Sequence, residues 1–271
     1  MKTILFLVLA IFLVPFKCLS DTLDDIKHKN EIVIGTEAKF PPFEFIEEGK
    51  IKGFSQDILD IIFRDKQINV KRIDVPFQSI IIGLKTKKFD YIATGLTATE
   101  ERDKKYRLSI PIADATVAML VRNDGEINTL EELSGKVIGS QTGSTLIKEI
   151  NSLSDKFESK SLKRLKIKEY VNFDEAYMDL SAKRVDGVAQ SFANLSYLVS
   201  KNPNKYKILD KFGRKQYFVW MARKDKDDES LANFFDSELK KLIEDGTIYK
   251  LQEKWFGFKM VVPSNNLKFG E

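Results

Sequence analysis

Cysteine and histidine are almost absent: the chain of 271 residues has one of each. A nucleophilic triad needs a histidine or an equivalent base, and the single histidine, His28, lies in a charged stretch before the first predicted strand. No pair of Cys or His residues has metal-ligand spacing, and the sequence contains no Gly-x-Ser-x-Gly elbow. We therefore expect neither a Ser-His hydrolase nor a bound metal or cofactor.

A surplus of one charge is also missing. Lys and Arg number 44 against 40 Asp and Glu, which leaves a net charge of +4. The one basic cluster (Lys160, Lys163, Arg164, Lys166, Lys168) is typical of a solvated face, so we expect no nucleic-acid partner. With 43% hydrophobic and 31% charged residues, the composition predicts a globular chain of one large or two modest domains.

Long apolar runs are limited to one, from Ile4 to Val14, which follows Lys2 and is too short to span a bilayer comfortably. This pattern predicts a secretory signal over residues 1–20, cut after Ser20, and therefore a periplasmic protein. The mature chain would then have no cysteine and no disulfide. The competing interpretation is a lipoprotein anchored through Cys18, but Lys17 stands where a small residue is expected.

The rest of the chain alternates between the hydrophobic periods of strands and helices. Strands are expected over 31–36, 70–75, 117–122, 137–139, 184–189 and 217–222 and in the apolar run that begins at Lys88, and helices over 55–62, 79–85, 146–150 and 231–243. Capping boxes at Thr129–Glu132 and Asn172–Glu175 predict two further helix starts, and the residues before Glu31 read as a polar lead-in. This alternation predicts an α/β fold with parallel strands.

Two hydroxyl-rich turns follow predicted strands and offer a place for an anion. In the first, Arg102 comes five residues after Thr97 and can bring a planar, permanently charged fork over the turn. In the second, Ser144 and Thr145 precede a helix, without the lysine of a phosphate loop. Each residue also has a structural interpretation: Thr97 as a helix cap, Arg102 as the surface partner of an acid, and the phenylalanines Phe40, Phe43 and Phe77 as core.

The order of seven short motifs identifies a family. The chain resembles the bacterial extracellular solute-binding proteins of family 3, which deliver polar amino acids to ABC transporters, from Glu31 to Phe258. The motifs are Phe40-Pro41-Pro42-Phe43-Glu44-Phe45, Gly53-Phe54-Ser55-Gln56-Asp57, Lys88-Phe89-Asp90 with Gly95 to Arg102, Leu133 to Gly139, Gly143-Ser144-Thr145, Arg184-Val185-Asp186-Gly187, and Asp245 to Tyr249 with Lys254-Trp255-Phe256.

The resemblance implies a two-lobed periplasmic binding protein type II fold, in which each lobe is a mixed or parallel sheet flanked by helices. Residues 21–114 plus 219–271 would form lobe 1, and residues 115–218 would form lobe 2. Two hinge strands, near Ala113–Thr116 and Gly213–Val219, would join the lobes and let them close on a ligand. The expected partners are a small amino-acid ligand and an inner-membrane ABC permease, and we expect a monomer.

The resemblance also implies roles for individual residues. Arg102 would pair with the ligand's α-carboxylate, and Gly95, Thr97 and Thr145 would bind its head group. Phe40 and Phe77 would sandwich its side chain, and Glu37 would meet a distal cation. The complete candidate ligand-binding set is Glu37, Phe40, Phe77, Gly95, Leu96, Thr97, Arg102, Ser144, Thr145, Gln190 and Ser191.

The chain departs from the family pattern at Ser191, where relatives that grip an α-ammonium have an aspartate. A neutral hydroxyl cannot neutralise an ammonium. Either Gln190, Thr97 or Glu37 meets the amino group, or the ligand is not a conventional α-amino acid. A second departure is Ser109-Ile110-Pro111-Ile112, where relatives usually have Ser-Asp-Pro-Tyr, so the pocket is expected to be more apolar near the hinge.

The sequence thus predicts a binding protein, not an enzyme, for a polar amino acid, either a basic one or a cystine- or glutamine-like one. Glu37 favours a basic ligand, whereas two flat aromatic rings suit the others equally. Three alternatives stay open: a periplasmic cyclohexadienyl or arogenate dehydratase on the same scaffold, a binding protein for a non-standard amino-acid derivative, and a sensor domain that reports its ligand to a partner protein.

Overall fold

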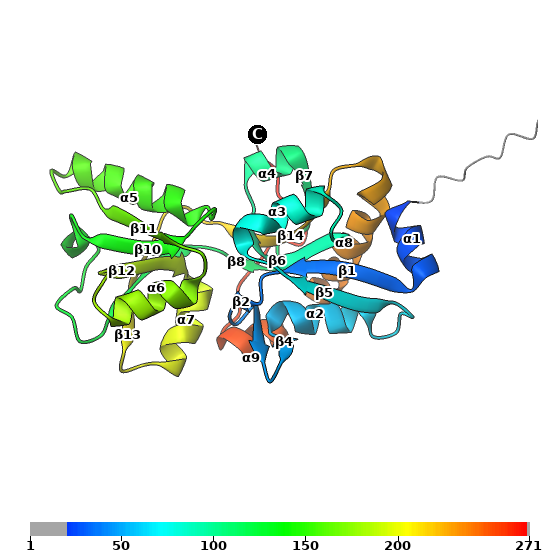
Figure 1. Cartoon of the computed structure of the whole chain (residues 1–271), viewed down its shortest axis with the longest axis horizontal. Coiled ribbons are helices and arrows are strands. Elements are labelled where there is room, and N and C mark those ends of the chain that lie inside the picture. Colours follow the sequence, from blue (N-terminus) through cyan, green and yellow to red (C-terminus); the bar gives the residue numbers. More distant parts are fainter. Residues whose placement is uncertain (1–20, 270–271) are drawn as a thin grey trace, which may run out of the picture.

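The computed structural model describes residues 21–269, so the predicted secretory signal (1–20) and Cys18 lie outside the described residues. Two β-sheets lie next to each other along the longest axis, and helices flank both of them (Figure 1). The α/β, two-lobed architecture predicted from the sequence is confirmed. Within residues 21–269, no helix is both long enough and apolar enough to cross a membrane.

The first sheet has six strands in the order β5-β1-β6-β14-β7, with β8 paired to β14. Its parallel part consists of β1 (Glu31–Thr36), β5 (Asn69–Asp74) and β6 (Tyr91–Thr97). The strand β14 (Tyr217–Arg223) runs antiparallel to β6 and also to β7 (Tyr106–Leu108) and β8 (Ala113–Asp114). The helices α2 (Phe54–Phe63) and α3 (Phe77–Lys85) connect the parallel strands, as the hydrophobic periods predict.

The second sheet has five strands in the order β11-β10-β12-β9-β13. The strand β10 (Val137–Gln141) is parallel to β11 (Lys166–Tyr170) and β12 (Gly187–Ser191), whereas β9 (Val117–Arg122) is antiparallel to β12 and β13 (Tyr206–Phe212). Three helices belong to this part of the chain: α5 (Leu146–Ser159), α6 (Phe173–Ser181) and α7 (Phe192–Lys201). The sheet therefore repeats the plan of the first one.

The chain passes between the sheets twice, after β8 at 115–116 and before β14 at 213–216. The buried Gln252 side chain donates to the carbonyl of Ile112 at 3.1 Å and accepts from the backbone N–H of Met260 at 2.7 Å. At the other crossing, the Gln216 amide donates to the Glu149 carboxylate at 2.5 Å. The predicted lobe ranges stay a proposal, because strand membership alone does not define moving bodies.

The remaining elements complete the first lobe and connect the strands. The small sheet contains β2 (Lys39–Phe40), β3 (Glu44–Glu47) and β4 (Lys50–Lys52), and the other helices are α1 (Thr22–Lys29), α4 (Glu100–Lys105), α8 (Glu229–Glu244) and α9 (Thr247–Phe256). Two short 3-10 turns, η1 and η2, span Glu131–Leu133 and Lys226–Asp228.

Two local predictions need correction. The polar lead-in before Glu31 contains the helix α1, which begins because the Asp21 carboxylate accepts a hydrogen bond from the backbone N–H of Asp24. The Thr129–Glu132 box opens only the 3-10 turn η1. The Glu132 carboxylate accepts a hydrogen bond from the Thr129 N–H, but the Thr129 hydroxyl does not cap the turn. The second box is confirmed: Asn172 caps α6 through the N–H of Glu175 at 3.2 Å.

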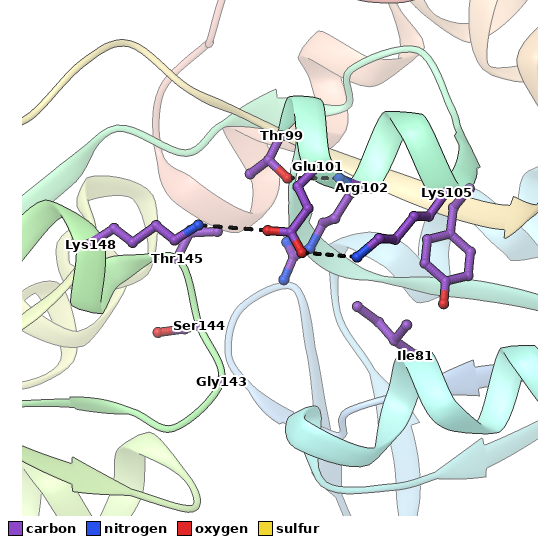
Figure 2. A pocket seen from close by; sticks show the side chains of 10 residues that line it. Ile81, Thr99, Glu101, Arg102, Lys105, Gly143, Ser144, Thr145 and Lys148 are labelled. Atoms are coloured by element: carbon purple, nitrogen blue, oxygen red, sulfur yellow. Dashed lines mark hydrogen bonds and ion pairs between the residues drawn. The ribbon is translucent and has the colours of Figure 1, made fainter.

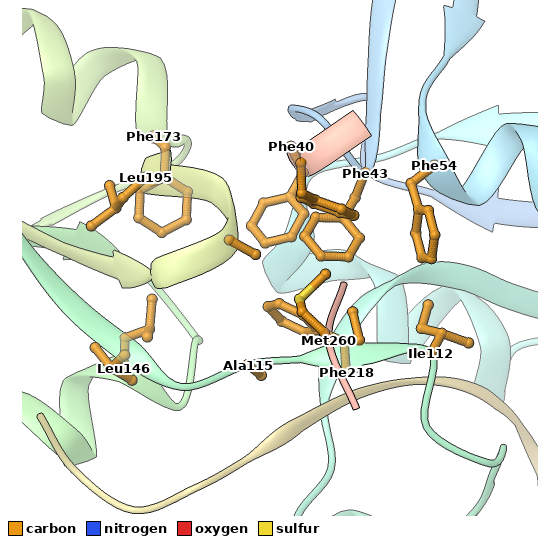
Figure 3. Packing of buried hydrophobic residues seen from close by; sticks show 14 of the residues in the cluster. Phe40, Phe43, Phe54, Ile112, Ala115, Leu146, Phe173, Leu195, Phe218 and Met260 are labelled. Carbon is orange, nitrogen blue, oxygen red and sulfur yellow. The ribbon is translucent and has the colours of Figure 1, made fainter. Parts of the chain in front are cut away.

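Packing of aromatic side chains links the sheets as well as filling each lobe. In the first lobe, Tyr91 and Phe235 stack with ring centroids 3.9 Å apart. A line of buried apolar side chains then runs from Phe54 through Phe43 and Phe40 to Phe173 and Leu195 of the second lobe (Figure 3). The Phe40 and Phe173 rings are 6.2 Å apart, so the hydrophobic core is continuous across the gap between the sheets.

Candidate functional site

A cavity between the two sheets is bordered by the ends of β6 and β10 and by the start of α5. This inner cavity is narrow, with a volume of about 20 Å³, which leaves room for about one water molecule. Its lining combines phenylalanines with hydroxyl and amide groups: Phe40, Phe77, Gly95, Thr97, Ala115, Gln141, Ser144, Thr145, Leu146, Phe173, Gln190 and Phe218.

A second, wider cavity adjoins the first, and the two share Ser144 and Thr145. This outer cavity contains Arg102, Glu101 and Lys105 from α4 on one side and the 143–145 turn with Lys148 on the other (Figure 2). The Lys148 ammonium lies 3.7 Å from the Glu101 carboxylate, which joins the two lobes over the mouth of the cavity. The charged groups therefore collect at the entrance and the apolar groups inside.

Arg102 projects from the first turn of α4, which Thr99 caps by accepting the Arg102 N–H at 3.2 Å. Its guanidinium donates to the carbonyl of Thr97 at 2.7 Å and lies 5.8 Å from the centre of the Phe77 ring. Within residues 21–269 it forms no ion pair. Burial lowers the pKa of Arg102 to about 10, with Glu101 opposing that shift, so the group stays charged at neutral pH.

The turn opposite Arg102 presents further donors. Gly143 has a φ of +75°, the left-handed conformation that glycine adopts without strain, and the Ser144 hydroxyl donates to the carbonyl of Gln141 at 2.7 Å. The helix α5 begins after Thr145 without a side-chain cap, which leaves N–H groups of its first turn free for an anion. Arg102 and this turn thus form the two sides of an anion site.

Four phenylalanines form the apolar walls of the inner cavity. Phe40 and Phe77 line it as predicted, but Phe173 and Phe218 were missed. The position of Phe173 directly after the capping Asn172 was the available signal, because it fixes that ring in the first turn of α6. Phe43 packs 4.8 Å from Phe256 and is fully buried core. Gly95 leaves room for Phe40, since a Cβ there would lie 2.7 Å from its ring.

Other predicted site residues lie at different depths. Glu37 does not line the inner cavity but a side opening, together with Lys39, Asp74 and Asn172. Its carboxylate accepts a hydrogen bond from the Gln141 amide at 2.5 Å, and burial raises its pKa to about 8. Leu96 packs into the core on the other face of β6. Gln190 lines the inner cavity, whereas Ser191 is buried behind it as the N-cap of α7.

A buried acid, Glu44, supports the cavity from the side of the first sheet. Its carboxylate accepts hydrogen bonds from the Thr94 hydroxyl and from the Gly95 N–H at 3.1 Å, while its second oxygen has no partner. Complete burial raises the pKa of Glu44 to about 7, although Thr94 and Arg72 oppose the shift. Glu44 is therefore largely protonated in the folded protein at mildly acidic pH.

This arrangement predicts a pH-dependent stability. Because the pKa of Glu44 is higher in the folded protein than the usual value of 4.5, the folded state holds more protons between about pH 4.5 and 7. The unfolding temperature should therefore fall as pH rises through that interval, and Glu44→Gln should flatten the slope. Thermal denaturation at a series of pH values measures both the slope and its change. Glu37→Gln is the comparison variant, because the pKa of Glu37 is raised as well. Equal slopes for wild type and Glu44→Gln would contradict the assignment.

Two α/β lobes of this topology, connected by two crossings with a cleft between them, define a type II periplasmic binding protein. The family model for the bacterial extracellular solute-binding proteins, family 3, matches residues 32–258. The chain belongs to this family. Among residues 21–269, no group of three or more His, Cys, Asp or Glu side chains is arranged to hold a metal ion.

Individual relatives place the chain among amino-acid-binding proteins. It is 29% identical over 231 residues to the arginine-binding periplasmic protein of Mannheimia haemolytica. The aligned residues cover 84% of this chain and 92% of that protein. A structure of an ancestral arginine-binding protein bound to arginine matches with a TM-score of 0.74 and 33% identity, over 84% of this chain and 99% of that one. A structure of an ancestral amino-acid-binding protein, a precursor of cyclohexadienyl dehydratase, matches with a TM-score of 0.77 and 28% identity. This match covers 87% of this chain and 99% of that one.

Proposed function

We propose that the protein captures a polar amino acid or a close derivative in the periplasm and delivers it to an ABC permease of the inner membrane. One observation carries this proposal: the guanidinium of Arg102, which has no carboxylate partner within the described chain, faces the donor-rich turn at Ser144 and Thr145. A ligand carboxylate would satisfy both sides at once, and bidentate pairing with arginine is strong where water is excluded.

The walls of the inner cavity favour a ligand with a flat or apolar body. Phe40 and Phe77 would sandwich it, with Phe173 and Phe218 closing the space around it. Glu37 at the side opening would meet a distal cation, which favours a basic amino acid, while the rings suit a cystine- or glutamine-like ligand too. The names of the relatives, two of which refer to arginine, support the basic alternative.

Lobe closure is the proposed mechanism of capture. Three polar contacts cross between the lobes: Gln141 to Glu37, Lys148 to Glu101, and the Asn194 amide to the carbonyl of Pro41 at 2.8 Å. These contacts must break for a ligand to enter, and they re-form around it. The proposal includes secretion by the segment 1–20, action as a monomer, and residues 21–114 plus 219–271 and 115–218 as the lobes.

Binding without catalysis agrees with the groups that line the cavity. A dehydratase needs a positioned general acid, but the inner cavity is lined by no Asp, Glu or His of the described residues. The histidine lies on α1, outside the cleft. Because one similar structure is a precursor of cyclohexadienyl dehydratase, incubation with prephenate and arogenate is the matching control, and we expect no product.

A thermal-shift screen of the mature protein tests the proposed function. The panel consists of the common amino acids, cystine, ornithine and several opines. A ligand that binds only the folded state raises the unfolding temperature, and the increase grows with the logarithm of its concentration relative to Kd. We expect a concentration-dependent increase with at least one member. No increase with any member at millimolar concentration would contradict an amino-acid ligand.

A further inference from the structure

The inner cavity offers hydrogen-bond donors and hydroxyls but no negative charge. Arg102 stands at its entrance, the Thr97 and Thr145 hydroxyls project from its sides, and no acidic side chain of the described residues lines it. Glu37, the acid expected from the sequence to meet a cation, lines the side opening instead. Its carboxylate already accepts a hydrogen bond from Gln141. A carboxylate entering this space is well compensated, whereas an ammonium beside that carboxylate is not.

Gln190 is the clearest unpartnered group of the inner cavity. Its side chain, at the end of β12, is 2% exposed, and its carbonyl oxygen already accepts the N–H of Ser191 at 2.7 Å. Among residues 21–269 the amide nitrogen forms no hydrogen bond of normal geometry, although the buried Tyr177 phenol lies close enough to interact with this side chain. A buried donor without a partner costs roughly 1–3 kcal/mol, so this nitrogen is a place where a ligand acceptor gains affinity.

Ser191 is occupied by the structure of α7. Its hydroxyl is hydrogen-bonded to the Asn194 side-chain oxygen and accepts the Asn194 N–H at 3.2 Å. The same Asn194 side chain donates to the carbonyl of Pro41 in the other lobe. The hydroxyl at this position therefore holds the helix start and the closed interface together, and it is not turned toward a ligand.

Backbone acceptors near the carboxylate site are occupied as well. The carbonyl of Thr97 accepts from Arg102, and the carbonyl of Gln141 accepts from Ser144. The Thr97 and Thr145 hydroxyls can accept, but a neutral oxygen does not neutralise a charge. Taking an ammonium out of water without a paired carboxylate is costly, whereas a neutral carbonyl needs only one good donor.

We propose that the ligand is a carboxylic acid whose α-substituent is an uncharged hydrogen-bond acceptor, such as a 2-oxo acid or an N-acylated amino acid, and that Gln190 recognises that acceptor. This inference rests on the proposed function, because it takes Arg102 as the carboxylate partner. Gln190 is then the residue that determines specificity at the α-position. The two ligand types share a carboxylate with a carbonyl oxygen close to it, and the experiment distinguishes them.

Calorimetry with three matched series tests the proposal on the mature wild-type protein. Each series keeps one side chain and varies the α-substituent: L-arginine, L-glutamine and L-phenylalanine, with the N-acetyl and the 2-oxo counterpart of each. In the series that binds, we expect one uncharged member to bind about tenfold or more tightly than the free amino acid. If the N-acetyl member binds more tightly, the recognised carbonyl belongs to an acyl group; if the 2-oxo member binds more tightly, it belongs to a 2-oxo acid.

A single substitution should reverse this preference. Gln190→Glu places a carboxylate of nearly the same shape on the wall of the inner cavity, so we expect the free amino acid to become the tighter ligand. Ser200→Asp adds the same charge to an exposed position at the other end of α7 and should keep the wild-type order. Gln190→Leu should weaken the uncharged ligand about tenfold and leave the weak binding of the free amine unchanged.

The outcomes separate this inference from the proposed function. Tighter binding of the free amino acid by wild type, or an unchanged order in Gln190→Glu, overturns the inference and leaves the carboxylate clamp standing. No binding by any member of the three series overturns both. A reversal in Gln190→Glu but not in Ser200→Asp supports the inference.

Discussion

Arg102→Ala should reduce ligand affinity several hundredfold or more, which corresponds to about 3–5 kcal/mol. The reason is that the guanidinium, unlike Lys105 and Lys148 of the same cavity, forms no ion pair within residues 21–269, and closure removes the water that would otherwise replace a ligand carboxylate. Arg102→Lys should retain part of the affinity, because an ammonium keeps the charge but loses the two-pronged geometry. Calorimetry with the ligand found by the screen measures both losses.

The fold should survive this change, because Arg102 lies on the short helix α4 and touches the core only through Phe77. Lys104→Ala is the matched control: it removes a positive charge from the same helix, where an exposed ion pair with Glu100 at 2.7 Å contributes little. Its affinity should equal that of wild type. An Arg102→Ala protein that binds as tightly as wild type would show that the carboxylate lies elsewhere.

The largest loss of stability is expected from Arg223→Met in the first lobe. Arg223 and Asp228 form a two-pronged ion pair with contacts of 2.5 and 2.8 Å, and their side chains are only 6% and 2% exposed. The guanidinium also donates to the carbonyls of Leu84 and Phe89 at 3.1 and 3.0 Å. Removing it leaves a buried, unpaired carboxylate, so the free energy of unfolding should fall by about 3–5 kcal/mol in urea denaturation.

A double variant shows whether the unpaired charge is the cause. Arg223→Met with Asp228→Leu removes both charges, and we expect it to recover part of the stability lost in Arg223→Met. Lys254→Ala is a surface control, because its ion pair with Asp57 at 2.7 Å is exposed and should change the free energy of unfolding by less than about 1 kcal/mol. A double variant less stable than Arg223→Met would attribute the loss to packing instead.

Hydrophobic periodicity predicts most of the elements in this chain, because each strand and helix buries one regular face. The strand Glu31–Thr36 coincides with β1, and 117–122 with β9. The helix α1 escapes prediction because it buries only Ile26 and depends on the Asp21 cap. The two-lobe arrangement was predicted by the repeat of strand, hydroxyl-rich turn and helix and by the order of motifs, since periodicity does not encode which strands share a sheet.

The structure brings predicted site residues together where function and local structure share a motif. Arg102, Thr97, Ser144 and Thr145 come together around two adjoining cavities, although their ligand contacts stay predictions. Gln141 and Phe218 could not be predicted as lining residues, because each sits in an ordinary strand and reaches the cavity only through the meeting of the two lobes. Sequence position alone also does not show that the Ser191 hydroxyl is used by Asn194.

The two glutamines beside the crossings determine where the protein can bend. Gln252, on α9, is hydrogen-bonded to Ile112, which precedes the first crossing, and to Met260, which follows α9. We therefore expect Ile112, α9 and Met260 to move as parts of one rigid body. Gln216 fastens the second crossing to α5 of the opposite lobe through Glu149. We therefore expect rotation to be confined to a few backbone torsions, at 115–116 and at the junction between Gln216 and Tyr217. With both pivots this short, we expect the lobes to follow a defined closing path.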